Sequence, residues 1–166
     1  MKTLGTTLLV ALVLAPAVAC AQANRTITGK VVAVRDGDLI NIVDAARVSH
    51  RIRLAGIDAP ALAQPFGKKA REVLFAKVFR KTVEIDVVMV DREHREVGYV
   101  SLGDRSINEY MVREGCAWRD VQNDNRGDFT AAEKDAREHK RGLWTDPHPV
   151  PPWEFKKAKR DSRKLE

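Results

Sequence analysis

The dipeptide Asp36-Gly37 limits the fold of this chain most, because it separates two segments rich in β-branched residues. Residues 26–34 precede the dipeptide and residues 39–43 follow it. Asp-Gly between two such segments is a strong signal for a tight β-hairpin. A third segment, residues 48–57, alternates aliphatic with basic side chains, as a strand does when one of its faces is buried. We therefore predict three successive strands at the start of the folded domain.

The rest of the chain changes between helical and strand patterns. Pro65 opens a segment in which apolar residues recur at helical spacing as far as Val78. Residues 83–87 and 97–102 are predicted to form two further strands. Two short helices follow, each predicted from a capping box and a terminating glycine: Ser106 with Glu109 and Gly115, then Thr130 with Glu133 and Gly142.

This order of elements favours an α+β fold. Five strands and three α-helices are compatible with an OB-fold, a small five-stranded Greek-key β-barrel that commonly binds oligonucleotides. Other α+β folds have the same order of elements. The chain has 166 residues, of which 44% are hydrophobic, so it has room for one folded domain of ordinary size. We place that domain at residues 24–146.

The first 23 residues have the pattern of a secretory signal peptide. Lys2 precedes an aliphatic segment, and Ala21-Gln22-Ala23 places small residues at the expected cleavage site. We therefore expect export to the periplasm or the exterior, and a mature protein without a stable membrane span. Cys20 leaves open processing as a lipoprotein, and an N-terminal anchor helix is a further alternative.

Residues 147–166 differ in composition from the domain before them. Four prolines occur within six residues, and the basic run 156–160 follows them. This composition is typical of a flexible tail. Such a tail would either keep the protein soluble or contact DNA without regard to its sequence.

The overall charge favours an anionic partner. Lys and Arg number 29 against 23 Asp and Glu, which gives a net charge of +6 at pH 7. That excess suits nucleic acid or an acidic membrane surface. Two cysteines are too few for a disulfide scaffold or a Cys-based zinc site, and we expect Cys116 to be buried and unreactive. We expect the protein to be a monomer.

Four charged side chains together indicate phosphodiester chemistry. Asp38 and Asp58 lie at the ends of predicted strands, and Arg53 and Arg95 come from separate parts of the predicted sheet. Carboxylate oxygens hold Ca²⁺ or Mg²⁺, and a bound metal ion polarises a phosphoryl oxygen. Guanidinium groups bind phosphate with two parallel hydrogen bonds and offset negative charge in a transition state.

These residues lie within motifs that resemble the staphylococcal nuclease (thermonuclease-like) family. The resemblance runs from about Thr26 to Trp144. The matching motifs, in order, are Val34-Arg35-Asp36-Gly37-Asp38, Arg53-Leu54-Ala55-Gly56-Ile57-Asp58-Ala59-Pro60, Gln64-Pro65-Phe66-Gly67, Asn108, Met111-Val112-Arg113-Glu114-Gly115 with Ala117-Trp118, and Gly142-Leu143-Trp144. The resemblance implies an OB-fold barrel with three α-helices and a calcium-dependent phosphodiesterase that acts on DNA and RNA.

The resemblance also implies roles for individual residues. Asp38 and Asp58 match the two metal-binding aspartates of the family, and the backbone carbonyl of Ala59 matches a main-chain metal ligand. Arg53 matches the first phosphate-binding arginine, and Arg95 matches the second. The implied cofactor is Ca²⁺.

The chain departs from the family pattern where the attacking water is activated. The family's glutamate directly follows Asp-x-Pro, and this chain has Ala61 there. A methyl group can neither accept a proton nor order a water molecule. Leu39 replaces a usual threonine, and Glu93 and His94 replace a tyrosine and a glycine. Three functions stay open: a metal-dependent nuclease with little sequence preference, a domain that binds nucleic acid without efficient cleavage, and an interaction module that keeps only the barrel.

Two further groups of residues are candidates for the site. Glu93 and His94 adjoin the second arginine, so they are either substitutes for the missing base or exposed turn residues. Lys68, Lys69 and Arg71 lie at the start of the first predicted helix. They would contact the phosphate backbone of nucleic acid if the cleft lies beside that helix, and would otherwise form a solvated face.

Overall fold

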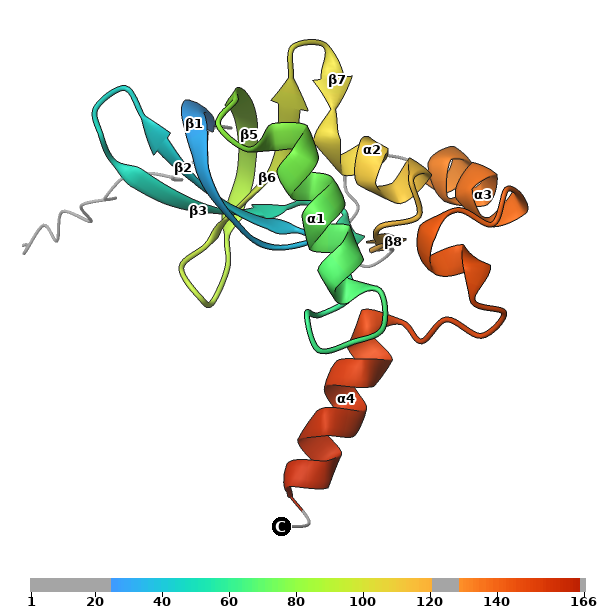
Figure 1. Cartoon of the computed structure of the whole chain (residues 1–166). Coiled ribbons are helices and arrows are strands. Elements are labelled where there is room, and N and C mark those ends of the chain that lie inside the picture. The colour runs from blue at the N-terminus through green and yellow to red at the C-terminus, as the bar shows by residue number, and fades with distance from the viewer. Residues whose placement is uncertain (1–24, 121–128, 165–166) are drawn as a thin grey trace, which may run out of the picture.

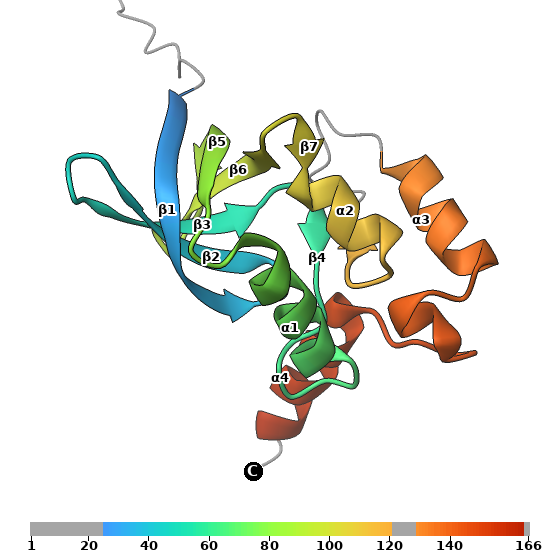
Figure 2. The same ribbon diagram turned by 45° about the horizontal axis from the view of Figure 1, so that its top comes forward.

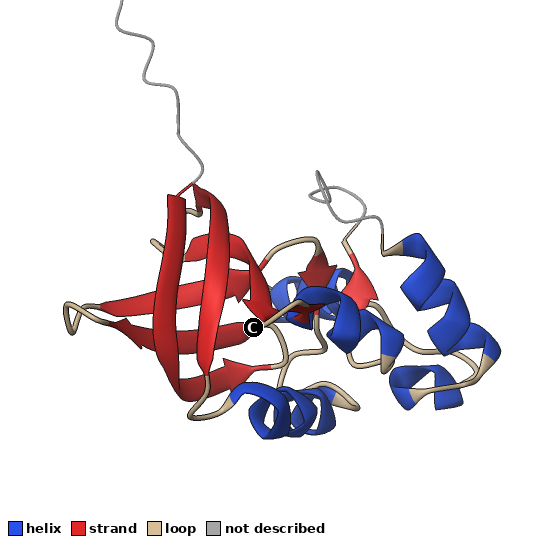
Figure 3. Cartoon of the chain, turned by 90° about the horizontal axis from the view of Figure 1, so that it is seen from above, coloured by secondary structure: helices blue, strands red, loops and turns tan. Residues whose placement is uncertain are grey.

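The computed structural model describes residues 25–120 and 129–164, and the structural statements below refer to these residues. Five strands close into a barrel in the order β3-β2-β1-β5-β6, and a parallel pairing of β3 with β6 completes the circle (Figure 1). Figure 3 shows this barrel from above. The predicted α+β fold with a five-stranded barrel is confirmed. The barrel strands are β1 (Arg25–Asp36), β2 (Leu39–Asp44), β3 (Ser49–Leu54), β5 (Thr82–Val90) and β6 (Glu96–Leu102).

Strand β1 pairs with β2 on one side and with β5 on the other, and a glycine lies where the two pairings overlap. Gly29 is the register partner of Asp44 on β2 and of Val83 on β5. A Cβ atom at Gly29 would lie 2.9 Å from the carbonyl oxygen of Val43, so a larger residue would push the strands apart. Close approach at this position lets the long strand curve from one neighbour to the other.

Short elements extend the barrel toward the helices. Strand β4 (Ile57–Asp58) pairs with β8 (Trp118–Arg119), and β7 (Arg105–Ser106) continues the sheet beyond β6. Buried Asn108 links its own helix to β6 and to the end of β3. Its Oδ1 accepts a hydrogen bond from the backbone N–H of Val100 at 2.8 Å, and its Nδ2 donates to the carbonyl of Ala55 at 2.8 Å. The helical segment that carries Asn108 is therefore tied to two barrel strands or their ends.

Four α-helices and one 3₁₀ helix lie within the described residues. Helix α1 packs on the barrel through Ala70, Leu74 and Val78. Figure 2 shows α2 beside α1 and near β7, with α3 beyond α2. The predicted cap of α2 is confirmed, because the Ser106 side chain accepts a hydrogen bond from the N–H of Glu109. The bounds are α1 (Gly67–Val78), α2 (Ile107–Arg113), α3 (Thr130–Glu138), the 3₁₀ helix η1 (Gly142–Thr145) and α4 (Pro152–Arg163).

Three predictions about helices were wrong. Gly142 does not end α3, which stops at Glu138; it is the first residue of η1. Thr130 does not cap α3: it is the first helical residue, and the cap position belongs to Phe129, which is buried and packs near Tyr99. The C-terminal segment is not a flexible tail over Pro152–Arg163, because these residues form α4, the fourth α-helix where three were expected. Figure 1 shows α4 projecting from the domain below the start of α1.

The predicted signal peptide, residues 1–23, lies outside the described residues, as does Cys20. Within the described residues, no helix combines the length and the apolar character that crossing a membrane requires.

Candidate active site

Two buried aspartates meet where the first hairpin touches the end of the third strand. Asp38 lies in the turn between β1 and β2 and is 5% exposed, and Asp58 ends β4 and is 7% exposed. The backbone N–H of Ala59 donates to Oδ2 of Asp38 at 3.3 Å. A Cβ atom on Gly37 would lie 2.7 Å from the Cβ of Ala59, so the turn approaches this loop as closely as only glycine allows.

Arg53 bridges the two carboxylates. Its Nη1 lies 3.1 Å from Oδ2 of Asp38, and its Nη2 donates to Oδ1 of Asp58 at 3.3 Å. The register of the barrel places Arg53 opposite Leu39, one residue after Asp38, so strand pairing brings the partners together. Burial by itself would lower the pKa of Arg53, but the charges of Asp38 and Asp58 raise it overall.

Burial raises the pKa of two aspartates at this hairpin. It raises the pKa of the Asp38 carboxyl to about 6, because the loss of water outweighs the opposing charge of Arg53. Burial also raises the pKa of Asp36, against the hydrogen bond that its Oδ1 accepts from the N–H of Gly37. A group of carboxylates held this close together attracts cations.

The second arginine is held by the turn between β5 and β6. Nε of Arg95 lies 2.6 Å from Oδ2 of Asp91, and Nη1 lies 3.2 Å from Oε2 of Glu93. Oδ1 of Asp91 also accepts hydrogen bonds from the backbone N–H groups of Glu93 and Arg95, which fixes the turn. Hydrogen bonds and the charge of Arg95 lower the pKa of Asp91 despite its partial burial.

Arg53 and Arg95 line one cavity of about 500 Å³. Its wall also contains the apolar or aromatic side chains of Met89, Val97 and Tyr99. The cavity therefore joins two guanidinium groups with a surface on which a flat, apolar group can rest.

The comparisons with known proteins show the family of the chain. A family model described as Staphylococcal nuclease homologue matches residues 51–146. The chain belongs to the staphylococcal nuclease family. Among its relatives, an "Uncharacterized endonuclease" of Escherichia coli O157:H7 is 40% identical over 134 residues, covering 80% of this chain and 87% of the relative. "Protein ParB" of Escherichia coli is 36% identical over 162 residues, covering 90% of each chain. "Staphylococcal-like nuclease CAN1" of Arabidopsis thaliana is 38% identical over 110 residues, covering 66% of this chain and 34% of the relative.

Membership in the staphylococcal nuclease family supports a nuclease, a hydrolase whose substrate is nucleic acid. The matched segment contains Arg53, Asp58 and Arg95. Asp38 precedes that segment but contacts Arg53 inside it. The resemblance noted from the motifs is confirmed at the level of the family.

The two aspartates offer the hard oxygen atoms that calcium prefers, but Arg53 and Lys156 already contact these oxygens, so a bound ion would have to displace those cations. No group of three or more His, Cys, Asp and Glu side chains arranged for a metal is found within residues 25–120 and 129–164. An ion bound by Asp38 and Asp58 would therefore draw its other ligands from the main chain, such as the Ala59 carbonyl, and from water.

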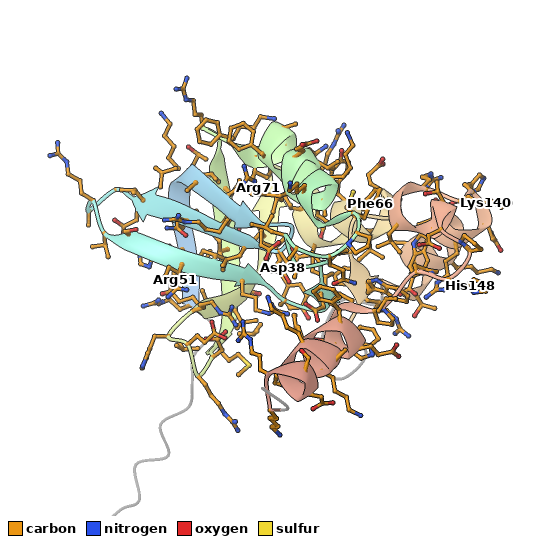
Figure 4. All side chains as sticks on the ribbon, turned by 60° about the horizontal axis from the view of Figure 1, so that its bottom comes forward. Asp38, Arg51, Phe66, Arg71, Lys140 and His148 are labelled. Carbon is orange, nitrogen blue, oxygen red and sulfur yellow. The ribbon has the colours of Figure 1, made fainter. Side chains whose placement is uncertain are left out.

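Several sequence candidates do not line the cavity. Lys68, Lys69 and Arg71 are exposed on α1, and none of them lines the cavity; Figure 4 shows Arg71 on that helix and Asp38 nearer α4. Glu93 and His94 also do not line it, nor do Asp38, Asp58 and Ala59, although the two aspartates contact Arg53 in the cavity wall. Glu93 is directed to Arg95, and His94 has a left-handed backbone with φ of 56° in the exposed turn.

The structure adds residues that sequence reasoning did not assign to the site. Lys156 of α4 lines the cavity, and its Nζ lies 2.9 Å from Oδ1 and 3.1 Å from Oδ2 of Asp58. Asp120, after β8, lines the same cavity. Asp36 was visible in the motif Asp36-Gly37-Asp38, but its place in the sequence indicated only a turn residue. The basic run 156–160 marked Lys156 as cationic, but nothing local to it indicated Asp58 as a partner.

Proposed function

We propose that this chain is an exported, calcium-dependent nuclease that hydrolyses phosphodiester bonds of DNA and RNA with little sequence preference. The observation that carries the proposal is the convergence of Arg53 and Arg95 on one cavity beside the buried carboxylates of Asp38 and Asp58. A phosphodiester presents anionic oxygens, and guanidinium groups on two walls of a cavity can hold it through paired hydrogen bonds.

The arginines bind the phosphate and stabilise the charge that grows on it. Asp38 and Asp58 orient Arg53, and Asp91 orients Arg95, so neither guanidinium has to reorganise during the reaction. Each guanidinium carries five N–H donors, which leaves donors for the phosphate beyond those used by the carboxylates. Preorganised donors of this kind stabilise a transition state more than mobile ones do.

Asp38, Asp58 and the carbonyl of Ala59 would hold the calcium ion. When bound, such an ion withdraws electron density from a phosphoryl oxygen. The protein itself contributes a water-poor setting, because both aspartates are buried and Arg53 covers them.

Low sequence preference follows from the apolar part of the cavity wall. Met89, Val97 and Tyr99 can contact the face of any base without reading its pattern of donors and acceptors. Phosphate contacts from Arg53 and Arg95 carry no sequence information either.

One observation favours a second candidate function, in which the chain binds nucleic acid but cleaves it poorly. Ala61 stands where the family has its glutamate, and Glu93 and His94 lie outside the cavity wall. General-base assistance is worth roughly 10²–10⁴-fold in rate. A site that keeps its arginines and carboxylates but lacks a base would still bind a phosphodiester.

A digestion experiment separates these functions. The chain from residue 24 onward is incubated with plasmid DNA, single-stranded DNA and RNA, in Ca²⁺ or in a chelator. The proposed nuclease cleaves all three in Ca²⁺ and none in chelator, and Asp38→Asn loses cleavage. Asp104→Asn, which changes an exposed carboxylate in the turn between β6 and β7, serves as the matched control. Binding without cleavage by the folded chain would favour the second function, and neither binding nor cleavage would overturn both.

Export is tested separately. The full chain is produced in a bacterium, and the N-terminus of the mature protein is determined from the periplasm and the medium. We expect it to begin at Asn24. A chain that keeps Met1 inside the cell would contradict export, and a lipid-modified Cys20 at the N-terminus would show lipoprotein processing instead.

A further inference from the structure

Helix α4 carries a cation into the active-site cavity from outside the segment that the family model matches. That segment ends at residue 146, and Lys156 follows it by ten residues of sequence. The Lys156 ammonium nevertheless contacts both carboxylate oxygens of Asp58, at 2.9 and 3.1 Å. The cavity that Arg53 and Arg95 line therefore has a third positive group on its wall.

Packing at the start of α4 determines where Lys156 lies. The ring of Trp153 meets that of Trp118 edge-on, with centroids 5.7 Å apart, and Trp118 packs in turn on Trp144 at 4.3 Å. Nε2 of buried Gln64 donates to the carbonyl of Val150 at 2.6 Å, just before the helix begins. Lys156 is thus held near Asp58 by contacts made by other residues as well as by its own ion pair.

The ammonium group is placed to serve an anion in the cavity as well as Asp58. The Lys156 side chain is 46% exposed, whereas the Asp58 side chain is 10% exposed. Asp58 also forms an ion pair with Arg53, so its carboxylate does not depend on Lys156 alone for a counter-ion. An ammonium has three donors on a flexible stem, and can turn toward a phosphate without leaving the cavity.

The same side of α4 continues the positive charge away from the cavity. Side chains three, four and seven positions after a helical residue share its face. After Lys156 these positions are Lys159, Arg160 and Arg163, all exposed. A nucleic acid strand that leaves the cavity along α4 would therefore meet further cations.

We propose that Lys156 is a third phosphate-binding residue of the active site, delivered by α4, and that it contacts the nucleic acid backbone together with Arg53 and Arg95. This inference rests on the proposed function, because it takes the cavity as the place where the phosphodiester binds. Helix α4 would then contribute directly to substrate binding.

The test measures binding of a fluorescent single-stranded DNA oligonucleotide in chelator, where no cleavage occurs, over a series of salt concentrations. We expect Lys156→Ala to weaken binding roughly tenfold, as the loss of a charged hydrogen bond does. It should also reduce the slope of log affinity against log salt by about 0.7, the value for one phosphate contact on a single strand. Lys156→Arg should keep most of the affinity. Lys157→Ala, which removes the same charge from the next position of α4, is the matched control and should have a smaller effect.

The outcomes distinguish this inference from the proposed function. Tighter binding by Lys156→Ala, or an effect equal to that of Lys157→Ala, would overturn the inference while cleavage by the wild type still supports the nuclease. Wild-type binding that depends on Lys156, without cleavage in Ca²⁺, would support the inference and reject efficient hydrolysis. Circular dichroism of each variant, and Trp153→Ala as a variant that loosens α4 without removing its charge, show whether a loss comes from unfolding or from the ammonium itself.

Discussion

Nη1 of Arg53 lies 3.1 Å from Oδ2 of Asp38, and both side chains are largely buried at the end of the first hairpin. The same guanidinium reaches Asp58 through Nη2, so one planar group holds two carboxylates that would otherwise repel each other. This arrangement depends on the planar, two-pronged shape of the Arg53 guanidinium as well as on its charge, because two N–H donors must point to two different carboxylates.

Replacing Arg53 with lysine should therefore lower activity although it keeps the charge. A lysine offers one ammonium on a flexible stem and cannot hold both carboxylates and a phosphate in one plane. We expect kcat to fall roughly 10²–10³-fold, as when one preorganised donor is removed from an active site. Arg51→Lys, an exposed change on the same strand, should leave kcat unchanged. Equal rates for Arg53→Lys and the wild type would show that charge alone is enough.

Restoring a carboxylate at position 61 should raise the rate of cleavage. Ala61→Glu places a group able to accept a proton where the family has one, and such help is worth roughly 10²–10⁴-fold. Ala61→Gln adds a similar volume without the basic group and should give no gain. The measurement is the single-turnover rate on a labelled oligonucleotide in Ca²⁺. If glutamate and glutamine behave alike, water activation is not what this chain lacks at position 61.

Asp38 should make the stability of the protein depend on pH. Burial raises its pKa from the usual 3.8 to about 6, so between these values the folded state binds more protons than the unfolded state. The contribution of Asp38 to the free energy of unfolding is thus fully present below about pH 4 and is lost as the pH rises through 6. The loss amounts to roughly 3 kcal/mol for a shift of this size.

Asp38→Asn removes this dependence and provides the comparison. Urea unfolding in chelator between pH 4 and 7 should show the variant gaining stability relative to the wild type as the pH rises. Asp104→Asn should follow the wild type, because Asp104 is exposed. Curves for Asp38→Asn and the wild type that stay parallel over this range would contradict the raised pKa.

Asn108 should be important for stability and not only for the local structure of α2. Its side chain satisfies the N–H of Val100 and the carbonyl of Ala55, and Asn108→Ala would leave both backbone groups buried without that partner. We expect the free energy of unfolding to fall by about 3 kcal/mol, given 1–3 kcal/mol for each group left unsatisfied. Ser101→Ala on β6, whose hydroxyl makes a long 3.5 Å contact, should cost much less. Equal losses in urea unfolding would argue against the network.

Cys116 should be unreactive in the folded protein. The residue is 2% exposed, and burial raises the pKa of its thiol to about 12. At pH 8 only about one thiol in ten thousand would be ionised, and the thiolate is the reactive form. Mass spectrometry after treatment with iodoacetamide should find the Cys116 peptide unmodified in the native protein and modified in urea. Rapid modification of the native protein would show that the segment after α2 opens readily.

Local sequence patterns correctly predicted those features of the fold that depend on residues close together in the sequence. The alternation of Ile52 and Leu54 with arginines predicted the buried and exposed faces of β3, and the serine at 106 predicted the start of α2. The pairing of Arg53 with Asp38 and Asp58 was not predicted, although the register that sets Arg53 opposite Leu39 brings it close to Asp38. The predicted cap at Thr130 was wrong, because α3 already includes Thr130 and buried Phe129 holds the cap position.

The sequence by itself predicted the barrel strands and the first hairpin, because strand alternation and turn chemistry act over a few residues. It proposed Asp38, Arg53, Asp58 and Arg95 as site candidates from their charge, their places in the predicted strands and their resemblance to the family's motifs. The tertiary structure alone decided that α4 is a docked helix and that Lys156 meets Asp58 across 98 residues of chain. A basic run has the same composition whether it is solvated or docked. The difference comes from the packing of Trp153 on Trp118 and from the burial of Asp58, which depend on how distant segments of the chain come together.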